Sequence, residues 1–375
     1  MFKTFFIDFL LNHNYDTCRR NNKVPTRLTP AAPCAYIPHM IRKALNDPSL
    51  EAHLATLSPD GVTFFSMGPR HGEIQMRGVL IHGTRAVNQM RANHSLGPIE
   101  TMTLGKGLLC SGLMASLLKD PGTIMLRIDG SGPAEGMSAE GMKAPSGSIG
   151  ARGRLFRNPM PREALEAESS IDLFGPGALT VTRMENDSRP FSGSIPLRTG
   201  NINKDLTRYF LESEQTRTAI DSGVYFTEEG RAFGAGALLL QALPGAADDF
   251  LAVAESMLTR LPPLGLWFAQ GGTRDNLIAA VFGEAGARRT AESGFSFDCP
   301  CSRERFLGHM AGLDKAVVAD ILEKGPWPLE TECHYCSSTF SYIKTEFENA
   351  LAPRRQDGTS APAEPEAEAE GSDWK

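Results

Sequence analysis

Four of the seven cysteines stand in two close pairs near the C-terminus, and this spacing constrains the fold more than any other feature. Cys299 and Cys301 flank Pro300, and Cys333 and Cys336 follow further along the chain. Two close thiolate pairs match the ligand set of a tetrahedral zinc ion. Pro300 favours extended backbone at Cys299, and residues i and i+2 of an extended segment point to the same side. The pattern therefore predicts a four-cysteine metal site.

The closeness of the first pair also bears on its oxidation. Two Cα atoms two positions apart in a strand are separated by roughly 6.6 Å, near the upper limit for a disulfide. A Cys299–Cys301 bond is therefore expected to be strained and easily reduced. Thiolates favour attack by peroxide or hypochlorite, and we expect Arg303, Arg305 and Lys344 to offset the negative charge and attract such oxidants.

Zinc is expected to hold this part of the chain together. A unit of about fifty residues is only marginally stable from its core alone. A structural zinc site of thiolates contributes on the order of 10–16 kcal/mol, whereas whole domains are stable by about 5–15 kcal/mol. We therefore expect loss of the ion to unfold residues 298–351.

The cysteine motif by itself leaves three functions open. It fits a structural zinc knuckle, a redox-sensing zinc site and a thiol-disulfide enzyme, although the βαβ context of the enzyme is missing. Cys18, Cys34 and Cys110 stand alone, and we expect them to be small buried or incidental residues. Four paired cysteines without a clear export signal indicate a reducing compartment, the cytoplasm.

Composition and motif searches argue against several partners. The net charge of -6 argues against a strongly basic nucleic-acid surface. No apolar stretch reaches the ~18 residues of a membrane helix. The sequence has no Gly-x-x-x-x-Gly-Lys-Ser/Thr loop, so ATP binding is not expected.

Five regions are predicted along the chain. Residues 1–72 are expected to form an irregular extension, because "VPTRLTPAAPCAYIP" is too rich in proline for regular structure. Residues 73–245 predict an α+β domain with a mainly antiparallel sheet. Residues 246–297 predict a helical linker, and 298–351 a small C-terminal zinc-binding domain. The Ala/Pro/Glu-rich tail, 352–375, predicts disorder.

Three helices can be placed more closely. Residues 99–120 have apolar residues at helical spacing and predict a largely buried helix despite their glycines. Residues 201–220 predict a second helix. A third is expected between an N-cap at Asp314 and a stop at Gly325 and Pro326.

Six strings of residues, in order, resemble one known family. "CPCSRERF" and "CHYCSSTFSY" carry the cysteines, and "IMLRIDGSGP", "RPFSGSIPL", "YFLESEQTRT" and "GALLLQALP" precede them. From about residue 73 to 350 the chain resembles the redox-regulated heat-shock holdases known as 33 kDa chaperonins. The extension and the acidic tail lie outside this resemblance.

The resemblance implies an ATP-independent chaperone rather than an enzyme. In such proteins the reduced form holds zinc through the residues that match Cys299, Cys301, Cys333 and Cys336. The resemblance further implies that oxidation forms the disulfides Cys299–Cys301 and Cys333–Cys336 and releases zinc. The small domain and the linker would then unfold, and the protein would capture unfolding client proteins as a homodimer. No nucleic-acid or membrane partner is expected. A structural-zinc interaction module, for instance for RNA, and a thiol-disulfide oxidoreductase remain as alternatives.

Overall fold

The computed structural model describes residues 40–69, 73–165, 170–185 and 189–351. The acidic tail, most of the predicted extension, and Cys18 and Cys34 lie outside these residues. Contacts divide the chain into two compact units. The first unit runs to Arg303 and includes Thr331–Phe340, whereas the second unit holds Glu304–Glu330 and the chain from Ser341 onward. All four paired cysteines therefore belong to the first unit.

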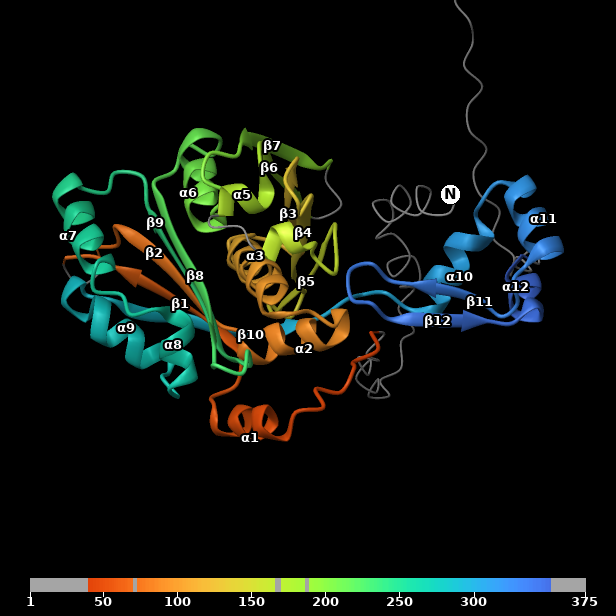
Figure 1. The fold of residues 1–375 in the computed structure, drawn as a ribbon. Coiled ribbons are helices and arrows are strands. Elements are labelled where there is room, and N and C mark those ends of the chain that lie inside the picture. Colours follow the sequence, from red (N-terminus) through yellow and green to blue (C-terminus); the bar gives the residue numbers. More distant parts are fainter. Residues whose placement is uncertain (1–39, 70–72, 166–169, 186–188, 352–375) are drawn as a thin grey trace, which may run out of the picture. The chain divides into compact units, whose positions relative to one another are not determined.

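The first unit is built on a ten-stranded sheet in the order β7-β6-β3-β4-β5-β10-β1-β2-β9-β8 (Figure 1). Its strands are β1 (Gly61–Met67), β2 (Met76–His82), β3 (Gly122–Gly130), β4 (Gly136–Lys143), β5 (Ile149–Leu155), β6 (Gly177–Glu185), β7 (Phe191–Pro196), β8 (Thr218–Phe226), β9 (Ala232–Ala242) and β10 (Arg288–Phe297). Neighbouring strands are antiparallel, except that β5 and β10 run parallel. The predicted α+β class with a mainly antiparallel sheet is confirmed.

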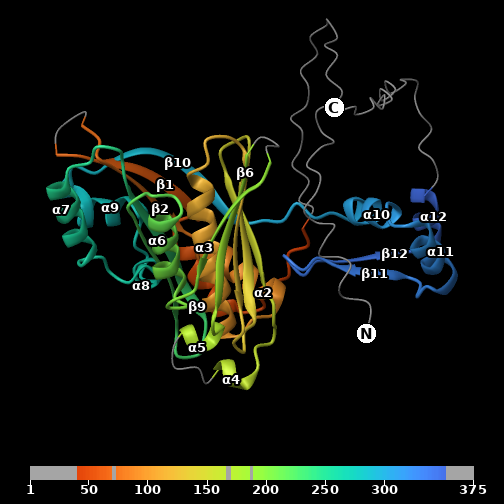
Figure 2. The same cartoon turned by 90° about the horizontal axis from the view of Figure 1, so that it is seen from above.

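Helix α3 (Pro98–Ser116) lies between the two halves of this sheet (Figure 2). It contacts β3, β4 and β5 on one side and β2, β8 and β9 on the other. Glycines permit this close packing, because a Cβ on Gly107 would lie 2.1 Å from Met137 Cε and one on Gly112 would lie 2.5 Å from Phe295. The predicted buried helix is confirmed, and its glycines have a packing role.

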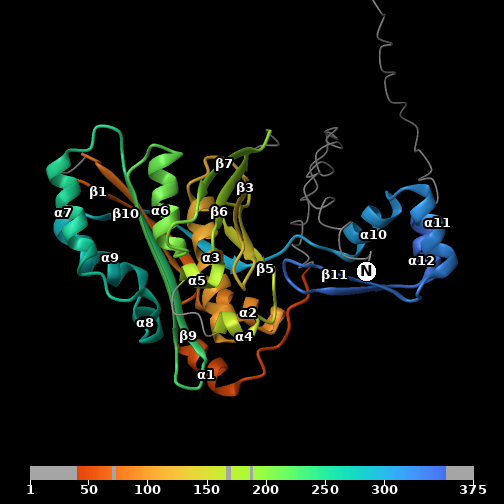
Figure 3. The ribbon, with the colours of Figure 1, turned by 45° about the horizontal axis from the view of Figure 1, so that its top comes forward.

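The other helices of the first unit are α1 (Pro48–Thr56), α2 (Thr84–His94), α4 (Arg162–Leu165), α5 (Ser170–Phe174), α6 (Ile202–Glu212), α7 (Asp248–Leu258), α8 (Leu264–Ala269), α9 (Arg274–Phe282) and the 3₁₀ turn η2 (Gly283–Ala285). Helices α7, α8 and α9 form a layer beside β1, β2 and β9 (Figure 3). Phe268, Leu277 and Phe282 from this layer pack with Phe65 and Leu80 of the strands, and all five are buried. The layer therefore shares a core with the sheet.

Three expectations about local structure are wrong in part. The predicted extension contains α1 and β1, because Asp47 caps α1 by accepting a hydrogen bond from Leu50 N–H and a proline stands at its first turn. The predicted helical linker ends in strand β10, which pairs with both β1 and β5. The helix predicted over 201–220 stops at Glu212, because the chain turns at Gln215 (φ 51°) and Thr218 begins β8.

The second unit contains the helices α10, α11 and α12. The elements of this region are α10 (Arg303–Ala311), α11 (Lys315–Lys324), α12 (Lys344–Leu351) and the paired strands β11 (Leu329–Glu332) and β12 (Thr339–Tyr342), which continue into the first unit. Helix α11 lies between Asp314 and Gly325 (φ 67°) as predicted. The small core of the second unit includes the rings of Trp327 and Phe347, whose centroids are 5.9 Å apart. None of the helices described above is long and apolar enough to cross a bilayer.

Candidate metal centre

The first cysteine pair follows directly on strand β10. The backbone N–H of Asp298 still donates to the carbonyl of Ala151 in β5 (3.0 Å), so the edge of the sheet fixes where the pair begins. Cys299 is 1% exposed and Cys301 is 5% exposed. Both side chains therefore lie inside the first unit.

The second pair occupies a tight knuckle between β11 and β12. Cys333 N–H donates to Ser338 O (2.9 Å), while Cys336 N–H and Ser337 N–H both donate to Cys333 O (3.2 and 2.7 Å). Ser337 takes the left-handed conformation (φ 50°) that closes this turn. The turn holds Cys333 and Cys336 with their sulfurs buried.

The four sulfur atoms all lie within 4.8 Å of one another. Cys299 Sγ is 3.7 Å from Cys333 Sγ, and Cys301 Sγ is 3.3 Å from Cys336 Sγ. Four sulfurs bound at ~2.3 Å around one tetrahedral ion would be about 3.8 Å apart. The geometry therefore fits a single metal ion held by the four predicted residues, which the fold brings together from two distant segments.

The four thiols differ in how readily each loses its proton. Hydrogen bonds from the other three thiols, Cys301 first, hold the pKa of Cys299 well below its usual range. The hydrogen bond with Cys299 raises the pKa of Cys301 and of Cys333. Because metal binding needs all four groups as thiolates, occupation of the site releases protons and stores negative charge at the centre.

Arg152 from β5 provides the positive charge beside the cluster. Its guanidinium donates to Cys299 Sγ (3.3 Å), pairs with Glu140 of β4 (2.5 Å), and lies 4.4 Å above the ring of Tyr335. The cysteine motif suggested charge compensation only from residues near it in sequence. Arg152 could not be predicted in this way, because only the pairing of β5 with β10 brings it to the cluster.

Two residues at the end of α2 anchor the knuckle from another side. Asn93 Nδ2 donates to Cys336 O (2.7 Å), and His94 Nε2 lies 3.2 Å from Tyr335 O. His94 Nδ1 is 3.0 Å from Ser337 Oγ, and burial lowers the pKa of this histidine. Both ring nitrogens of His94 therefore contact the knuckle, one at Tyr335 and the other at Ser337. No pattern in the sequence links α2 to the cysteines.

Cys110 has a different environment from the paired cysteines. It is fully buried in α3, with Ser222 Oγ at 3.6 Å and Asn203 Oδ1 at 3.8 Å. Burial raises the pKa of its thiol to about 12. The prediction of a buried packing residue is confirmed.

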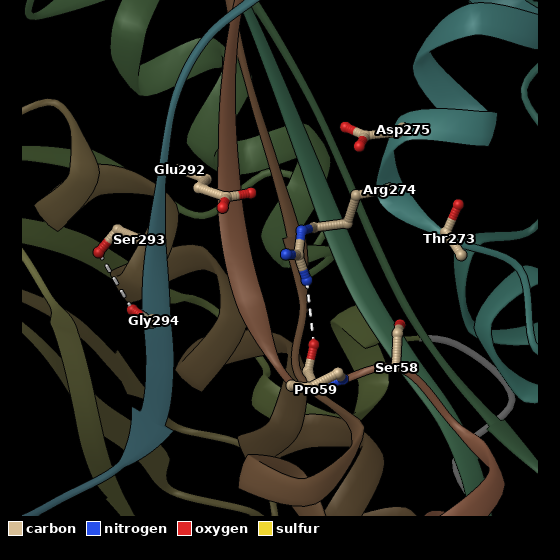
Figure 4. Close-up of a pocket in the computed structure, with 8 residues that line it drawn as sticks. All are labelled: Ser58, Pro59, Thr273, Arg274, Asp275, Glu292, Ser293 and Gly294. Carbon is tan, nitrogen blue, oxygen red and sulfur yellow. Dashed lines mark hydrogen bonds between the residues drawn. The ribbon is translucent and has the colours of Figure 1, made fainter.

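A surface cavity of about 610 Å³ also lies in the first unit (Figure 4). Arg274 at the start of α9 extends across it and donates to Pro59 O (3.1 Å) and Thr63 Oγ1 (2.9 Å). The arginine therefore ties α9 to the beginning of β1. Asp275 and Glu292 add charge to the lining, which includes none of the four cysteines.

Comparisons with known proteins agree with this arrangement. The family model described as "Hsp33 protein" matches residues 71–342. The 33 kDa chaperonin of Shouchella clausii is 28% identical over 282 residues, which cover 74% of this chain and 93% of that protein. The 33 kDa chaperonin of Desulforamulus reducens is 28% identical over 269 residues, covering 72% and 90%.

A solved structure shows the same fold. The crystal structure of the 33 kDa chaperonin (heat shock protein 33 homolog) from Thermotoga maritima superposes with a TM-score of 0.65 at 23% identity, covering 77% of this chain and 97% of that one. The residues that the family model matches include strands β2 to β10 and all four clustered cysteines. The chain belongs to the Hsp33 family of chaperones.

Proposed function

We propose that this chain is an ATP-independent holdase that is activated by oxidation of its four-cysteine centre. The observation that carries the proposal is the gathering of four buried sulfurs within 4.8 Å, drawn from two sequence-close pairs. Soft thiolates in a tetrahedral set suit zinc, and Cys299, Cys301, Cys333 and Cys336 would hold it in the reduced state. Zinc bound there would keep the sulfurs deprotonated and the two segments joined.

Oxidation would remove the ligand set. Each cysteine pair gives two electrons to one peroxide molecule, so that two thiolates, one peroxide and two protons become one disulfide and two waters. Two such steps leave no thiolate for the ion. We propose the pairs Cys299–Cys301 and Cys333–Cys336, because once the segments separate, closing a loop of a few residues costs less entropy than closing a long one.

Loss of the ion would then free apolar surface. We propose that residues 298–351 and the preceding 246–297 lose their packing after metal release, and that the exposed surface binds unfolding proteins. The buried apolar side chains of α8 and α9, such as Phe268, Leu277 and Phe282, are candidates for this surface. The active form is proposed to be a cytoplasmic homodimer that needs neither ATP nor nucleic acid.

One observation favours a second candidate, a structural zinc module without a redox role. The four cysteines are at most 5% exposed, so an oxidant reaches them only after the centre opens. A purely structural site would keep its zinc under peroxide. A thiol-disulfide oxidoreductase, the third candidate, would turn over insulin with its thiols intact.

Light scattering of an aggregating client protein separates these candidates. We expect one zinc per reduced chain, release of that zinc by peroxide with mild heating, and suppression of aggregation only by the oxidised protein. Equal suppression by the reduced, zinc-loaded protein would contradict activation by oxidation. Retention of zinc together with salt-dependent RNA binding would favour the structural module instead.

A further inference from the structure

The segment Met40–Asp47, which we term the N-terminal strap, runs from α1 along α2 to the cysteine centre. It forms no helix or strand, and it lies outside residues 71–342, the part matched by the family model. Most of its side chains are exposed, although Met40 is buried. Polar contacts of its backbone therefore contribute much of what holds it in place.

The strap reaches one sulfur of the centre through a single hydroxyl. Ile41 N–H donates to Ser338 Oγ (2.9 Å), and the same oxygen lies 3.2 Å from Cys336 Sγ. Ser338 is 1% exposed, so water does not compete for these contacts. The position of the knuckle thus decides whether the N–H of Ile41 has a hydrogen-bond acceptor.

Asn93 ties the strap to the knuckle a second time. Its Nδ2 donates to Ile41 O (2.9 Å) and to Cys336 O (2.7 Å). Its Oδ1 accepts from Lys43 N–H (3.2 Å) and from Gln89 Nε2 (2.8 Å). The fully buried amide therefore uses both of its donor hydrogens and both acceptor positions. Displacement of either the strap or the knuckle would leave part of this amide unsatisfied.

The strap also contacts the segment that leads into the first cysteine pair. Arg42 donates to the carbonyl of Phe297 (3.1 Å), two residues before Cys299. The strap therefore bonds to both segments that supply sulfurs, one through Arg42 and the other through Ile41.

We propose that the N-terminal strap is a latch that keeps the reduced centre closed and limits how often its sulfurs become accessible to oxidant. The inference rests on the proposed function, because it concerns regulation of the same centre. When the sulfurs rearrange, Ser338 and the carbonyl of Cys336 move with them, and the strap loses its partners. Coupling of this kind is reciprocal, so bonds that hold the strap only in the closed state also favour that state.

Replacement of Arg42 tests the latch in the full-length chain. Arg42→Met removes the bond to Phe297 and should raise the initial rate of zinc release at a fixed peroxide concentration by roughly three- to tenfold, the value of one such bond. Lys43→Met is the matched control, because it removes the same charge from the strap but leaves the backbone bond of Lys43 to Asn93. Arg42→Lys keeps a donor and should restore most of the slow rate.

A backbone variant tests the second attachment. Ile41→Pro removes the N–H that donates to Ser338 and should also accelerate zinc release severalfold. Ala44→Pro serves as its control, because the structure gives the exposed Ala44 no hydrogen bond within the described residues. Melting temperatures of the oxidised proteins should be equal for all variants, since the strap is released in that state.

The outcomes separate the latch from the proposed function. A wild-type protein that keeps its zinc under peroxide would overturn both. Wild-type release with Arg42→Met and Ile41→Pro no faster than their controls would overturn the latch alone. The latch would also be wrong if the variants lowered the melting temperature of the oxidised protein as much as that of the reduced protein, because this would show a general structural role.

Limited trypsin digestion observes the strap directly, since trypsin cleaves after Arg42 and Lys43. We expect slow cleavage at these two bonds in the reduced, zinc-loaded protein and at least tenfold faster cleavage after oxidation, because a protease needs a locally released backbone. Equal cleavage rates in the two states, measured on samples that have demonstrably lost zinc, would show that the strap does not respond to the centre.

Discussion

At the scale of single residues, Arg152 is the charged side chain that contacts the cysteine centre most directly. It is enclosed between Glu140, Cys299 and the ring of Tyr335, so its charge acts in a poorly hydrated environment. The thiolate charge of Cys299 and the carboxylate of Glu140 both favour the charged guanidinium. Arg152 therefore stabilises the anionic centre and fixes the knuckle through Tyr335.

Replacement of Arg152 is expected to weaken metal binding. Arg152→Met removes the donor to Cys299 and leaves Glu140 unpaired beside the thiolates, so affinity for zinc should fall by about 10- to 100-fold. Competition with a chromophoric chelator on the reduced protein measures this. Arg157→Met is the control, because among the residues that the structure describes Arg157 makes only an exposed ion pair with Glu135 (3.6 Å). Unchanged affinity in Arg152→Met would show that the arginine has no part in metal binding.

Two buried groups outside the centre, Asp60 and His82, should have opposite effects on how the stability of the fold changes with pH. Burial raises the pKa of Asp60 to about 6 and lowers the pKa of His82 to about 3. Between about pH 4 and 6 the folded chain holds one proton, on Asp60, and the unfolded chain also holds one, on His82. The two contributions to the pH slope of stability therefore cancel in this window.

Asp60→Asn should reveal the contribution of His82 alone. Stability from neutral His82 is present above pH 6.5 and is lost as the pH falls towards 3, so the variant should lose about 1.4 kcal/mol per pH unit relative to wild type between pH 6 and 4. Urea unfolding at several pH values measures the difference. Parallel curves for the two proteins would mean that the pKa shift of Asp60 is absent, and a flat curve for the variant would mean that the shift of His82 is absent.

The residues of the centre differ in how far the sequence could predict them. Cys299, Cys301, Cys333 and Cys336 form a local pattern, and a tetrahedral ion requires them to meet whatever the fold. Arg152 and Asn93 carry no such pattern. Their contacts with the sulfurs and the knuckle exist only because β5 pairs with β10 and α2 ends beside the knuckle. Contacts of that kind depend on the complete fold.

At the scale of elements, the contact between α3 and the sheet is the most sensitive to side-chain size. A Cβ on Gly141 of β4 would lie 2.1 Å from the backbone oxygen of Ser111 in α3, which cannot move away alone. Helix α3 can therefore pack this closely against β4 only because Gly141 has no side chain.

Gly141→Ala should consequently cost at least 1–3 kcal/mol of unfolding free energy, from overpacking between α3 and β4. Gly294→Ala is its control, since Gly294 also lies in the sheet but has open space around its Cβ position. Urea midpoints of the two variants provide the comparison. Equal midpoints would mean that α3 shifts freely and that the packing is looser than described.

Helices and strands also differ in how well the sequence predicts them. Helix α3 could be predicted because its apolar residues extend over several turns. Strand β10 could not, because three of its first five residues are charged and only Phe295 and Phe297 alternate towards the core. The short β1 follows α1 after the loop 57–60, and a prediction based on the proline-rich region upstream carried the irregular extension too far along the chain.

At the scale of the whole molecule, metal removal should affect the two parts of the fold differently. Chelation of zinc from the reduced chain should abolish hydrogen-exchange protection in residues 298–351, where a small core depends on the ion. Helix α3 and the strands of the sheet that precede residue 246 have an extensive buried core and should keep their protection. Protection of 298–351 that survives chelation would show that the ion is dispensable for folding.

The central claim is that oxidation of the four-cysteine centre activates the chaperone. It is tested most directly by measuring zinc released, free thiols and suppression of client aggregation on the same samples along a series of peroxide concentrations. We predict that suppression rises in proportion to zinc release, with four thiols lost per zinc. Full suppression before zinc is lost, or complete zinc loss without suppression, would contradict the claim.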